Sequence, residues 1–475
     1  MRSCWASLVL VSPATYSVHA QHRRNAPGSK ALPSTFQWKA LNDSVAGRPV
    51  HAVPSGEVCR QTNCTILDWA RANWRHTILG AMNQSSITNG PHPTPTNQII
   101  QDYDSNSPSL CGQTTPATCG QGDVPLYAIL AETAEDIQAA VNFARNHDLR
   151  LSIKASSHDY LGRFTAKNSL LIHTYKIQSI SFSDNYVVGN VNKGFAVTAG
   201  NGVGLSALYN ASEKTGKIFV GGTATTVVTG GGYVQGAGHS ALSPFLGLAA
   251  DNALGALLLM RVINFEQSLI LSSRTAVELR KANEASNPDR TYTIATDTIF
   301  PNATAEQAIP ALAPFFADLI AGTGAVVISN TTAVGATANE LLAEADDIVG
   351  GYAALSIHSH LVADRKVAQN AHIDNAVNLG WRSAKIHHST IQQVNTALNK
   401  LKTQQPSIFE TIPGLAAAAH SNEADPFEEN WQSVFYGKNY DRLSAVKRKY
   451  DPSDLFVVRA GVGSERWDED GFCRV

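Results

Sequence analysis

The chain has 475 residues, of which 43% are hydrophobic and 16% charged, and its formal net charge is −2. This length exceeds that of one ordinary domain, and the composition supports a sizeable core and excludes extensive disorder. The near-neutral charge argues against a nucleic-acid-binding surface. No run of about 18 apolar residues predicts a membrane span.

The N-terminal residues have the features of a secretory signal. Arg2 precedes a short apolar stretch, Trp5 to Val11, and S-V-H-A follows and ends at Ala20. Small residues at Val18 and Ala20 fit a signal-peptidase site, so residues 1–20 are predicted to be a signal peptide. The chain is accordingly expected to be secreted or to lie in the secretory pathway. The alternative is a disordered N-terminal leader.

Residues 21–120 are predicted to form a disulfide-stapled extension. They are rich in Pro, Ser, Thr, Asn and Gly, with one helix expected near Ile66 to Ala81. The close pairs Cys59/Cys64 and Cys111/Cys119 favour short-loop disulfides over a zinc site, because four residues separate Cys59 from Cys64 and no ligand partners stand at zinc spacing. Six sequons permit glycosylation, at Asn42, Asn63, Asn83, Asn210, Asn302 and Asn330.

Regular structure is expected from Val124 onward. V-P-L-Y-A-I-L-A reads as a strand, and Thr133 with Asp136 three residues later is typical of a helix start. Leu151 and Ile153 begin a strand that runs into the turn S-S-H-D. Further strands are predicted at Leu170–His173, Ile177–Phe182, Tyr186–Asn190, Phe195–Ala199 and Lys217–Val220, with a helix at Val203–Thr215.

After Leu254 the pattern weakens. Two apolar strands and a polar helix at Thr275–Ala285 are predicted, and an amphipathic helix at Tyr440–Tyr450 ends at Asp451–Pro452. Between them, strands are expected at Tyr292–Thr296, Ala325–Ser329 and Ala353–His358, and helices at Ala305–Leu319, Glu340–Val349 and His388–Lys400. The pattern of short strands and few helices predicts an α+β fold. The domains are expected at residues 121–275, 276–430 and 431–475.

Two stretches have the residue types that a phosphate-rich cofactor requires. Ala155, Ser156 and Ser157 are small enough for backbone N–H groups to approach a pyrophosphate, and the Gly221–Gly222 and Gly230–Gly232 runs offer similar access. A flexible or tightly turning loop explains such glycines equally well. The sequence contains no G-x-S-x-G elbow, H-E-x-x-H motif or P-loop, which lowers hydrolase, zincin and NTPase interpretations.

Three polar positions in these stretches have more than one interpretation. His158 and His239 could each act as an acid, a base, a ligand or a hydrogen-bonding partner within a turn. Asp251 with Asn252 could serve the polar edge of a cofactor or cap a local turn. Residue types and spacing alone leave these choices open.

Four motifs, taken together, resemble the fungal berberine-bridge-enzyme-like flavin oxidases of the vanillyl-alcohol oxidase superfamily. They are V-P-L-Y-A-I-L-A-E-T-A-E-D-I-Q-A-A-V-N-F-A, S-H-D-Y-L-G-R, G-G-G-Y-V-Q-G-A-G-H-S-A-L-S-P-F-L-G-L-A-A-D-N-A-L and F-Y-G-K-N-Y-D-R-L-S-A-V-K-R-K-Y-D-P-S-D-L-F. They stand in the family's order. The resemblance implies a two-lobed PCMH-type FAD-binding domain, an α+β substrate domain and a C-terminal segment that returns to the flavin.

The resemblance also implies roles for individual residues. His158 aligns with the histidine that bonds to the flavin 8α-methyl group. The other residues expected to contact FAD are Ser156, Ser157, Asp159, Gly222, Gly230, Gly231, Asp251, Asn252, Asn439 and Tyr440. H-S-N-E-A-D resembles the strand that carries catalytic groups, which makes Glu423 and Asn422 candidates for proton transfer, although a solvated acidic loop is an alternative for Glu423.

Two departures from the family pattern modify these expectations. Ala224 stands where many relatives have a second, cysteinyl flavin link, so attachment is expected through His158 alone. After Leu254 the chain lacks the relatives' Gly-rich segment, with on the order of 20 to 30 residues missing or replaced relative to the family pattern.

The expected function is an FAD-dependent oxidase of a small-molecule alcohol or secondary metabolite that uses O2 and releases H2O2. A catalytically impaired flavin-fold protein and a flavin dehydrogenase with another acceptor are the alternatives. A monomer is expected, without a metal site, a nucleic-acid partner or a membrane span.

Overall fold

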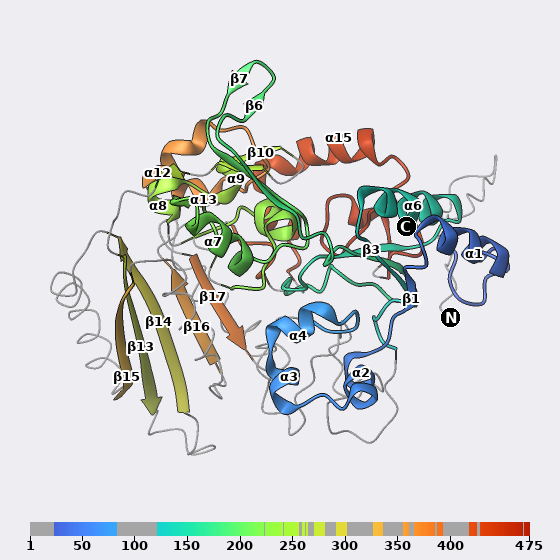
Figure 1. The fold of residues 1–475 in the computed structure, drawn as a ribbon, viewed down its shortest axis with the longest axis horizontal. Helices are drawn as coiled ribbons and strands as arrows, with labels where there is room; N and C mark the ends of the chain where they lie inside the picture. The colour runs from blue at the N-terminus through green and yellow to red at the C-terminus, as the bar shows by residue number, and fades with distance from the viewer. Residues whose placement is uncertain are drawn as a thin grey trace, which may run out of the picture.

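The computed structural model describes residues 23–82, 121–255, 365–384, 418–424 and 428–475, apart from Thr223, Ala241 and Glu469. Between residues 259 and 392 it further describes the backbone of several strands. The architecture is α+β, with two sheets in one lobe and a separate group of strands on the other side of the molecule (Figure 1). Among the described residues, no helix combines the length and hydropathy that crossing a bilayer requires.

The N-terminal segment is more helical than the sequence predicted. It contains α1 (Thr35–Ser44), α2 (Ser55–Thr62), α3 (Ile66–Ala70) and α4 (Ala72–Thr77). The Ser34 side chain and Gln37 form a capping box that starts α1. The single helix predicted near Ile66 to Ala81 is wrong, because Arg71 adopts an extended conformation (φ −78°, ψ 125°) that separates α3 from α4. The predicted Cys59–Cys64 disulfide is present, and Cys473 is also disulfide-bonded. The predicted pair Cys111/Cys119 lies outside the described residues.

The first sheet has the strand order β1-β2-β4-β3 and holds the strand that leads to the predicted cofactor turn. Its strands are β1 (Pro49–His51), β2 (Tyr127–Leu130), β3 (Leu151–Lys154) and β4 (Leu170–His173). β2 and β3 both pair in parallel with β4, and α6 (Ala134–Asn146) provides the crossover from β2 to β3. α6 starts at the predicted Thr133–Asp136 capping box. Its buried Ala140 and Ala144 pack on the sheet and on α1, in a core made of Leu41, Val45, Ile129, Leu149, Leu151, Leu170, Ile172 and Leu455.

The second sheet, of order β10-β11-β8-β5, is antiparallel and lies next in the chain. Its core is formed by α7 (Leu205–Glu213) packed on β8, around Val197, Leu205, Leu208, Tyr209 and Phe219. The elements of this part are β5 (Ile180–Ser183), β6 (Val187–Val188), β7 (Val191–Asn192), β8 (Ala196–Ala199), β9 (Lys217–Ile218), the helical turn η1 (Thr229–Tyr233), α8 (Ser243–Leu246), α9 (Ala249–Asn252), β10 (Ala253–Gly255), β11 (Leu259–Arg261) and β12 (Ile263–Asn264).

The region expected to form the substrate domain contributes long antiparallel strands. β13 (Ile270–Arg280) pairs with β14 (Thr291–Pro301) and β15 (Val326–Gly335), and β16 (Leu355–His360) pairs with β17 (His387–Gln392). These strands gather on the side of the molecule away from α1 and α6 (Figure 1). The sequence predicts strands at Tyr292–Thr296, Ala325–Ser329 and Ala353–His358. β14, β15 and β16 overlap these positions, with different bounds.

Two helices predicted in this region are wrong where the backbone is described. The predicted helix Thr275–Ala285 begins inside β13, and the predicted helix His388–Lys400 begins inside β17. In β13, Val277 and Leu279 alternate with polar residues, a period of two that fits a strand paired on both edges. The helices predicted at Ala305–Leu319 and Glu340–Val349 lie outside the described residues.

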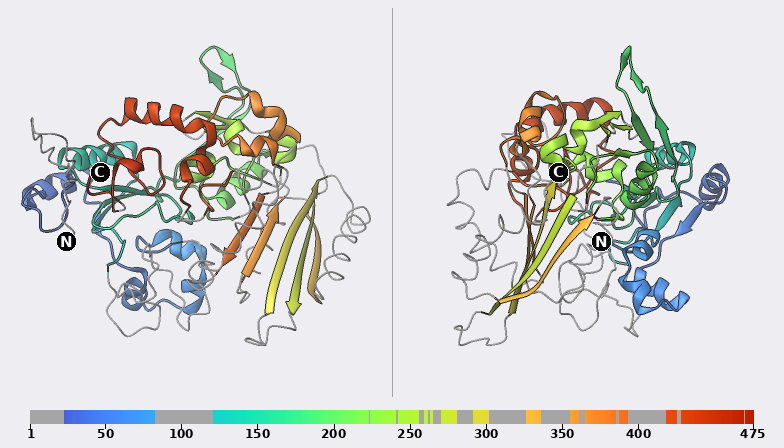
Figure 2. Two further views of the ribbon diagram at one scale, coloured as in Figure 1. Left: turned by 180° about the vertical axis from the view of Figure 1, so that it is seen from behind. Right: turned by 60° about the vertical axis from the view of Figure 1, so that its left-hand side comes forward.

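The C-terminal segment returns to the first lobe. It comprises η4 (Gln432–Tyr436), η5 (Gly437–Asn439), α15 (Tyr440–Tyr450) and η6 (Ser464–Arg466), and α15 has the predicted bounds. Leu455 is buried in the core of the first sheet, and Arg23 forms a bridge with Cys473. Figure 2 shows this red segment lying over the lobe that contains α6. Three further short elements precede it: α12 (Arg365–Gln369), η2 (Asn370–His372) and α13 (Gly380–Ser383).

Candidate functional site

The turn that carries His158 follows Lys154, whose position is fixed by hydrogen bonds. Lys154, the last residue of β3, is fully buried. Its Nζ donates to the carbonyl oxygens of Ile78 at 2.5 Å and Ala81 at 2.7 Å. Burial lowers the pKa of Lys154 to about 7. These bonds hold the end of β3 against the segment after α4, so the following residues leave the sheet in a defined direction.

His158 lies in a tight turn with a hydroxyl partner. Ser157 adopts a left-handed conformation (φ +63°), and its Oγ donates to the Ser156 carbonyl oxygen at 2.5 Å. His158 Nε2 lies 2.7 Å from Thr226 Oγ1. Burial lowers the pKa of His158 to about 3, while the charge of Glu423 acts in the opposite direction. The imidazole is therefore neutral at physiological pH, the form in which a ring nitrogen has a lone pair to donate.

The C-terminal segment is bonded directly to this turn. Asp159 pairs with Arg163, whose Nη2 lies 2.5 Å from Asp159 Oδ1. The same guanidinium donates to the Ser421 carbonyl oxygen at 2.9 Å, and the Tyr160 N–H donates to the Asn422 carbonyl oxygen at 2.8 Å. Residues more than 250 positions apart in sequence thus meet at the His158 turn.

The Gly-rich block faces the same turn. A Cβ at Gly231 would lie 3.4 Å from the Ala155 Cβ, and one at Gly232 would lie 2.0 Å from Asn422 Nδ2. At Gly230 it would lie 2.2 Å from Asn201 Oδ1. Side chains at Gly230 and Gly232 would collide with these neighbours, so the close approach of backbone to the turn depends on glycine. Gly222 lies slightly apart, where its carbonyl accepts a bond from the Tyr209 hydroxyl at 2.9 Å.

Asp251 stands in a buried ion pair. Its carboxylate accepts two bonds from Arg382, at 2.6 Å and 2.8 Å, and further bonds from the Asn370 and Asn375 amides. Burial disfavours the charged carboxylate, but the Arg382 bonds prevail and lower its pKa. Asn252 donates to the carbonyl oxygens of Leu246 and Leu248. Asp251 therefore connects two distant segments and Asn252 stabilises its own turn, and the contact of either with a cofactor stays a prediction.

Of the two predicted C-terminal residues, Asn439 bonds to the segment before α13 and Tyr440 bonds within the C-terminal segment. Asn439 Nδ2 donates to the Val377 carbonyl oxygen at 2.8 Å, and the Tyr440 hydroxyl donates to Glu465 Oε2 at 2.6 Å. Their approach to a cofactor also stays a prediction.

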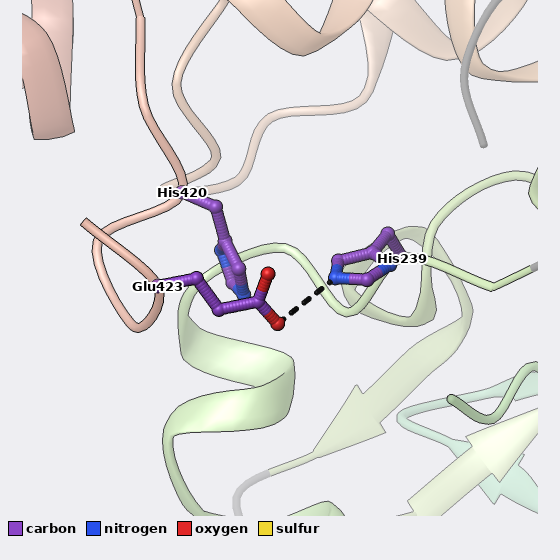
Figure 3. A group of neighbouring side chains, drawn as sticks. All are labelled: His239, His420 and Glu423. Atoms are coloured by element: carbon purple, nitrogen blue, oxygen red, sulfur yellow. Dashed lines mark hydrogen bonds and ion pairs between the residues drawn. The ribbon is translucent and has the colours of Figure 1, made fainter. Parts of the chain in front are cut away.

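Glu423 lies in a cluster with two histidines (Figure 3). His420 and Glu423 come from the C-terminal segment, and His239 faces them from the end of the Gly-rich block. His239 Nε2 lies 3.4 Å from Glu423 Oε1. His420 is 6% exposed, and burial lowers its pKa to about 4. His420 begins the H-S-N-E-A-D segment, but the sequence predicts no role for it and leaves the role of His239 open.

In the part of the chain that the structure describes, several buried polar atoms at the glycine block and around Lys154 lack a hydrogen-bond partner. Among the described residues, buried polar atoms without a hydrogen-bond partner include Asn201 Oδ1, Thr229 Oγ1, His76 Nε2 and His173 Nε2. Asn201 and Thr229 lie at the glycine block, and the two histidines interact electrostatically with Lys154. Buried polar atoms normally have partners. A bound ligand with donors and acceptors would supply partners to such atoms.

Comparisons with known proteins cover the same segments. Residues 125–261 match the FAD binding domain family, and residues 419–463 match the family described as berberine and berberine like. An uncharacterized FAD-linked oxidoreductase of Arthroderma benhamiae is 29% identical, over 95% of this chain and 95% of that protein. A VAO-type flavoprotein oxidase of Thermothelomyces thermophilus is 27% identical, over 96% of each chain.

Solved structures share the fold. The VAO-type flavoprotein MtVAO615 of Myceliophthora thermophila C1 has a TM-score of 0.69 at 24% identity, covering 95% of this chain and 100% of that one. MtVAO713 of the same fungus has a TM-score of 0.74 at 18% identity, with 96% and 100% covered. The fold is that of the VAO-type flavoproteins, with a PCMH-type FAD-binding domain. The chain is similar to fungal FAD-linked oxidoreductases, and two of its segments match the FAD binding domain family and the berberine-like family.

The chain is internally shorter than its relatives. The alignment with the Arthroderma protein extends over 586 positions, which is 111 more than the 475 residues available, so at least that many positions are gaps in this chain. The gap positions in this chain therefore outnumber the 20 to 30 residues expected to be missing, and the alignment length does not locate them. The placement of the gap just after Leu254 stays a prediction.

Proposed function

We propose that this FAD-linked oxidoreductase is an oxidase of small-molecule alcohols or secondary metabolites. The observation that supports the proposal most directly is the convergence of the His158 turn, the glycine block and residues 420–423 at one place. FAD bound there would accept a hydride from a substrate carbon and pass both electrons to O2, which leaves as H2O2.

His158 would provide the single covalent link to the cofactor. Its neutral imidazole has the lone pair that bond formation requires, and the Thr226 hydroxyl fixes the ring orientation. Ala224 offers no thiol for a second link. The remaining contacts proposed for FAD are those of Ser156, Ser157, Asp159, Gly222, Gly230, Gly231, Asp251, Asn252, Asn439 and Tyr440.

Glu423 is the proposed acceptor of the substrate hydroxyl proton. The carboxylate is partly exposed, with 26% of its side chain accessible, and its charge acts on both His158 and Tyr160. Asn422 precedes it, and its side chain lies against Gly232 and Gly236, where it could orient a bound substrate. A base beside the cofactor can remove the hydroxyl proton as the hydride leaves the adjacent carbon.

The covalent link is tested by acid precipitation of purified full-length protein. Wild-type pellets should keep flavin absorbance, whereas His158→Ala pellets should lose it. His372→Ala is the matched control, because His372 is exposed and bonds within its own turn. A colourless wild-type pellet would contradict the proposed link, and absence of flavin absorbance from the native protein would contradict the proposed function as a whole.

The acceptor is tested under anaerobic conditions. Alcohols and secondary metabolites are screened for bleaching of the flavin, and air is then admitted. An oxidase should recover its colour with stoichiometric peroxide. Recovery only with an added dye would instead identify a dehydrogenase.

The gaps of at least 111 positions in this chain, relative to the Arthroderma protein, support one alternative, an impaired flavin-fold protein. Such a protein would bind FAD weakly and would show no bleaching with any substrate. Sequencing the transcript across Leu254 to Arg290 establishes whether the shorter chain is the expressed one.

A secretory location is also part of the proposal. The Cys59–Cys64 disulfide supports it, because stable disulfides form in oxidising compartments. Removal of residues 1–20 and glycosylation at the predicted sequons would be detected by intact mass of the secreted protein.

A further inference from the structure

We propose that His239, His420 and Glu423 bind a divalent transition-metal ion of the zinc class. One ligand atom from each residue lies within 4.8 Å of the other two. Two imidazoles and one carboxylate are the ligand set of three-ligand zinc sites, in which a further position stays open for water or substrate. This site goes beyond the proposed flavin function and does not depend on it.

His239 and Glu423 form a long direct contact, and its length also matches that between two ligands of one ion. His239 Nε2 and Glu423 Oε1 are 3.4 Å apart, whereas a strong N–H···O bond measures about 2.9–3.0 Å. Two ligands of a tetrahedral ion, each about 2.0–2.1 Å from the metal, lie about 3.3–3.4 Å from each other. A small shift of the ligand nitrogen of His420 would complete such a site.

The surroundings orient the ligands as a metal site requires. His420 Nδ1 lies 2.9 Å from the Gly236 carbonyl oxygen, so this nitrogen carries the proton and Nε2 keeps its lone pair. The Trp381 indole stacks on the His239 ring, with centroids 5.8 Å apart, and meets His420 edge-on. Outer contacts that fix both imidazole rings are typical of metal sites.

The cluster is open to a ligand and lies beside the His158 turn. His239 and Glu423 are partly exposed, with 19% and 26% of their side chains accessible, whereas His420 is buried. Residues 421 and 422 bond to Arg163 and Tyr160 of the turn. An ion here could bind an oxygen of water or of a substrate hydroxyl and lower its pKa. In the metal-loaded protein Glu423 would then act as a ligand and not as the proton acceptor.

The test is metal analysis of the full-length protein. Purified wild type is equilibrated with Zn2+, Co2+ or Fe2+, or with Mg2+ or Ca2+ as hard ions, and bound metal and flavin are measured on the same sample. About one transition-metal ion per chain and no retained hard ion is expected, because imidazole ligands favour the former. Co2+ should also give a visible absorption spectrum typical of N/O ligands in a site of low symmetry.

Variants locate the site. Zn2+ binding should weaken by at least about tenfold in each of the variants His239→Gln, His420→Gln and Glu423→Gln. Loss of a residue that only contacts a metal ligand already costs about tenfold, so loss of a ligand should cost no less. His372→Gln should bind like wild type. Flavin content and the unfolding midpoint of each variant report whether the chain is folded.

Wild type that retains no transition metal would overturn the proposal, as would a Co2+ spectrum unchanged from that of the aqueous ion. Metal that binds equally to wild type and to all three folded variants would do the same. Flavin absorbance without bound metal would refute the metal site and leave the oxidoreductase function intact.

Discussion

Replacing Arg382 by Met should destabilise the protein by about 3 kcal/mol, because the change leaves a buried carboxylate without its counter-ion. The Asp251 side chain is 1% exposed and that of Arg382 is 7% exposed. Breaking such a pair from one side typically costs about 3–5 kcal/mol. The lower end applies, since Asn370, Asn375 and the Leu248 N–H still donate to the carboxylate.

A second pair in the chain provides the matched control. Arg442 and Asp374 approach within 2.5 Å, much as Arg382 and Asp251 do at 2.6 Å, but their side chains are 59% and 75% exposed. Solvent screens an exposed pair, so Arg442→Met should cost less than about 1 kcal/mol. The two variants therefore separate the effect of burial from the effect of removing an arginine.

The assay is urea unfolding followed by tryptophan fluorescence, with the change in stability taken from the midpoint. The double variant Asp251→Asn with Arg382→Met should be more stable than Arg382→Met alone, because it buries no unpaired charge. The lowered pKa of Asp251 means that the pair stabilises the fold above the unfolded-state pKa of about 3.9 and loses this effect as pH falls further. The reasoning fails if Arg382→Met costs no more than Arg442→Met at pH 7.

Three other changes have definite expected outcomes. Replacing Cys59 and Cys64 together by Ser should cost about 2 kcal/mol, the chain-entropy value for so short a loop, measured by the urea midpoint without reductant. Asp454→Asn should lower the free energy of unfolding by about 2 kcal/mol, because the buried carboxylate accepts charged bonds from Arg466 and Arg474. It should also make the C-terminal segment sensitive to protease. Asp374→Asn, at an exposed position, should have neither effect. Lys154, with a pKa lowered to about 7, is neutral in the folded protein and charged in the unfolded chain between about pH 7 and 10.4. Stability should therefore rise with pH over that interval in wild type but not in Lys154→Met, and a flat wild-type profile would contradict this assignment.

Local signals in the sequence predicted local structure well. The Thr133–Asp136 box starts α6, and α15 spans Tyr440–Tyr450 as its amphipathic pattern indicated. Ser34 with Gln37 is an equal signal that would have predicted α1. β13 shows the limit of such reasoning, because pairing with β14 and β15 outweighs the helical preference of a polar stretch.

Contacts between distant segments could not be predicted. No spacing rule connects Asp251 to Arg382 or His239 to His420, since each pair is brought together only by the packing of separate segments. The family resemblance predicted that Asp251 contacts the cofactor, and nothing in the sequence indicated that Arg382 would pair with its carboxylate. The resemblance also predicted that the C-terminal segment returns to the flavin domain. In the structure, hydrogen bonds from Arg163 and Tyr160 attach this segment to the His158 turn.

Residues 420–423 take part in both the proposed flavin site and the proposed metal site. Their backbone contacts the first, and their side chains form part of the second. The carbonyl groups of Ser421 and Asn422 hold the His158 turn, while the side chains of His420 and Glu423 face His239. Side-chain substitutions at His420 and Glu423 therefore leave the bonds to the turn in place. Loss of metal binding with retained covalent flavin is thus an interpretable outcome, because backbone atoms of this segment bond to the His158 turn and its side chains form the proposed metal site.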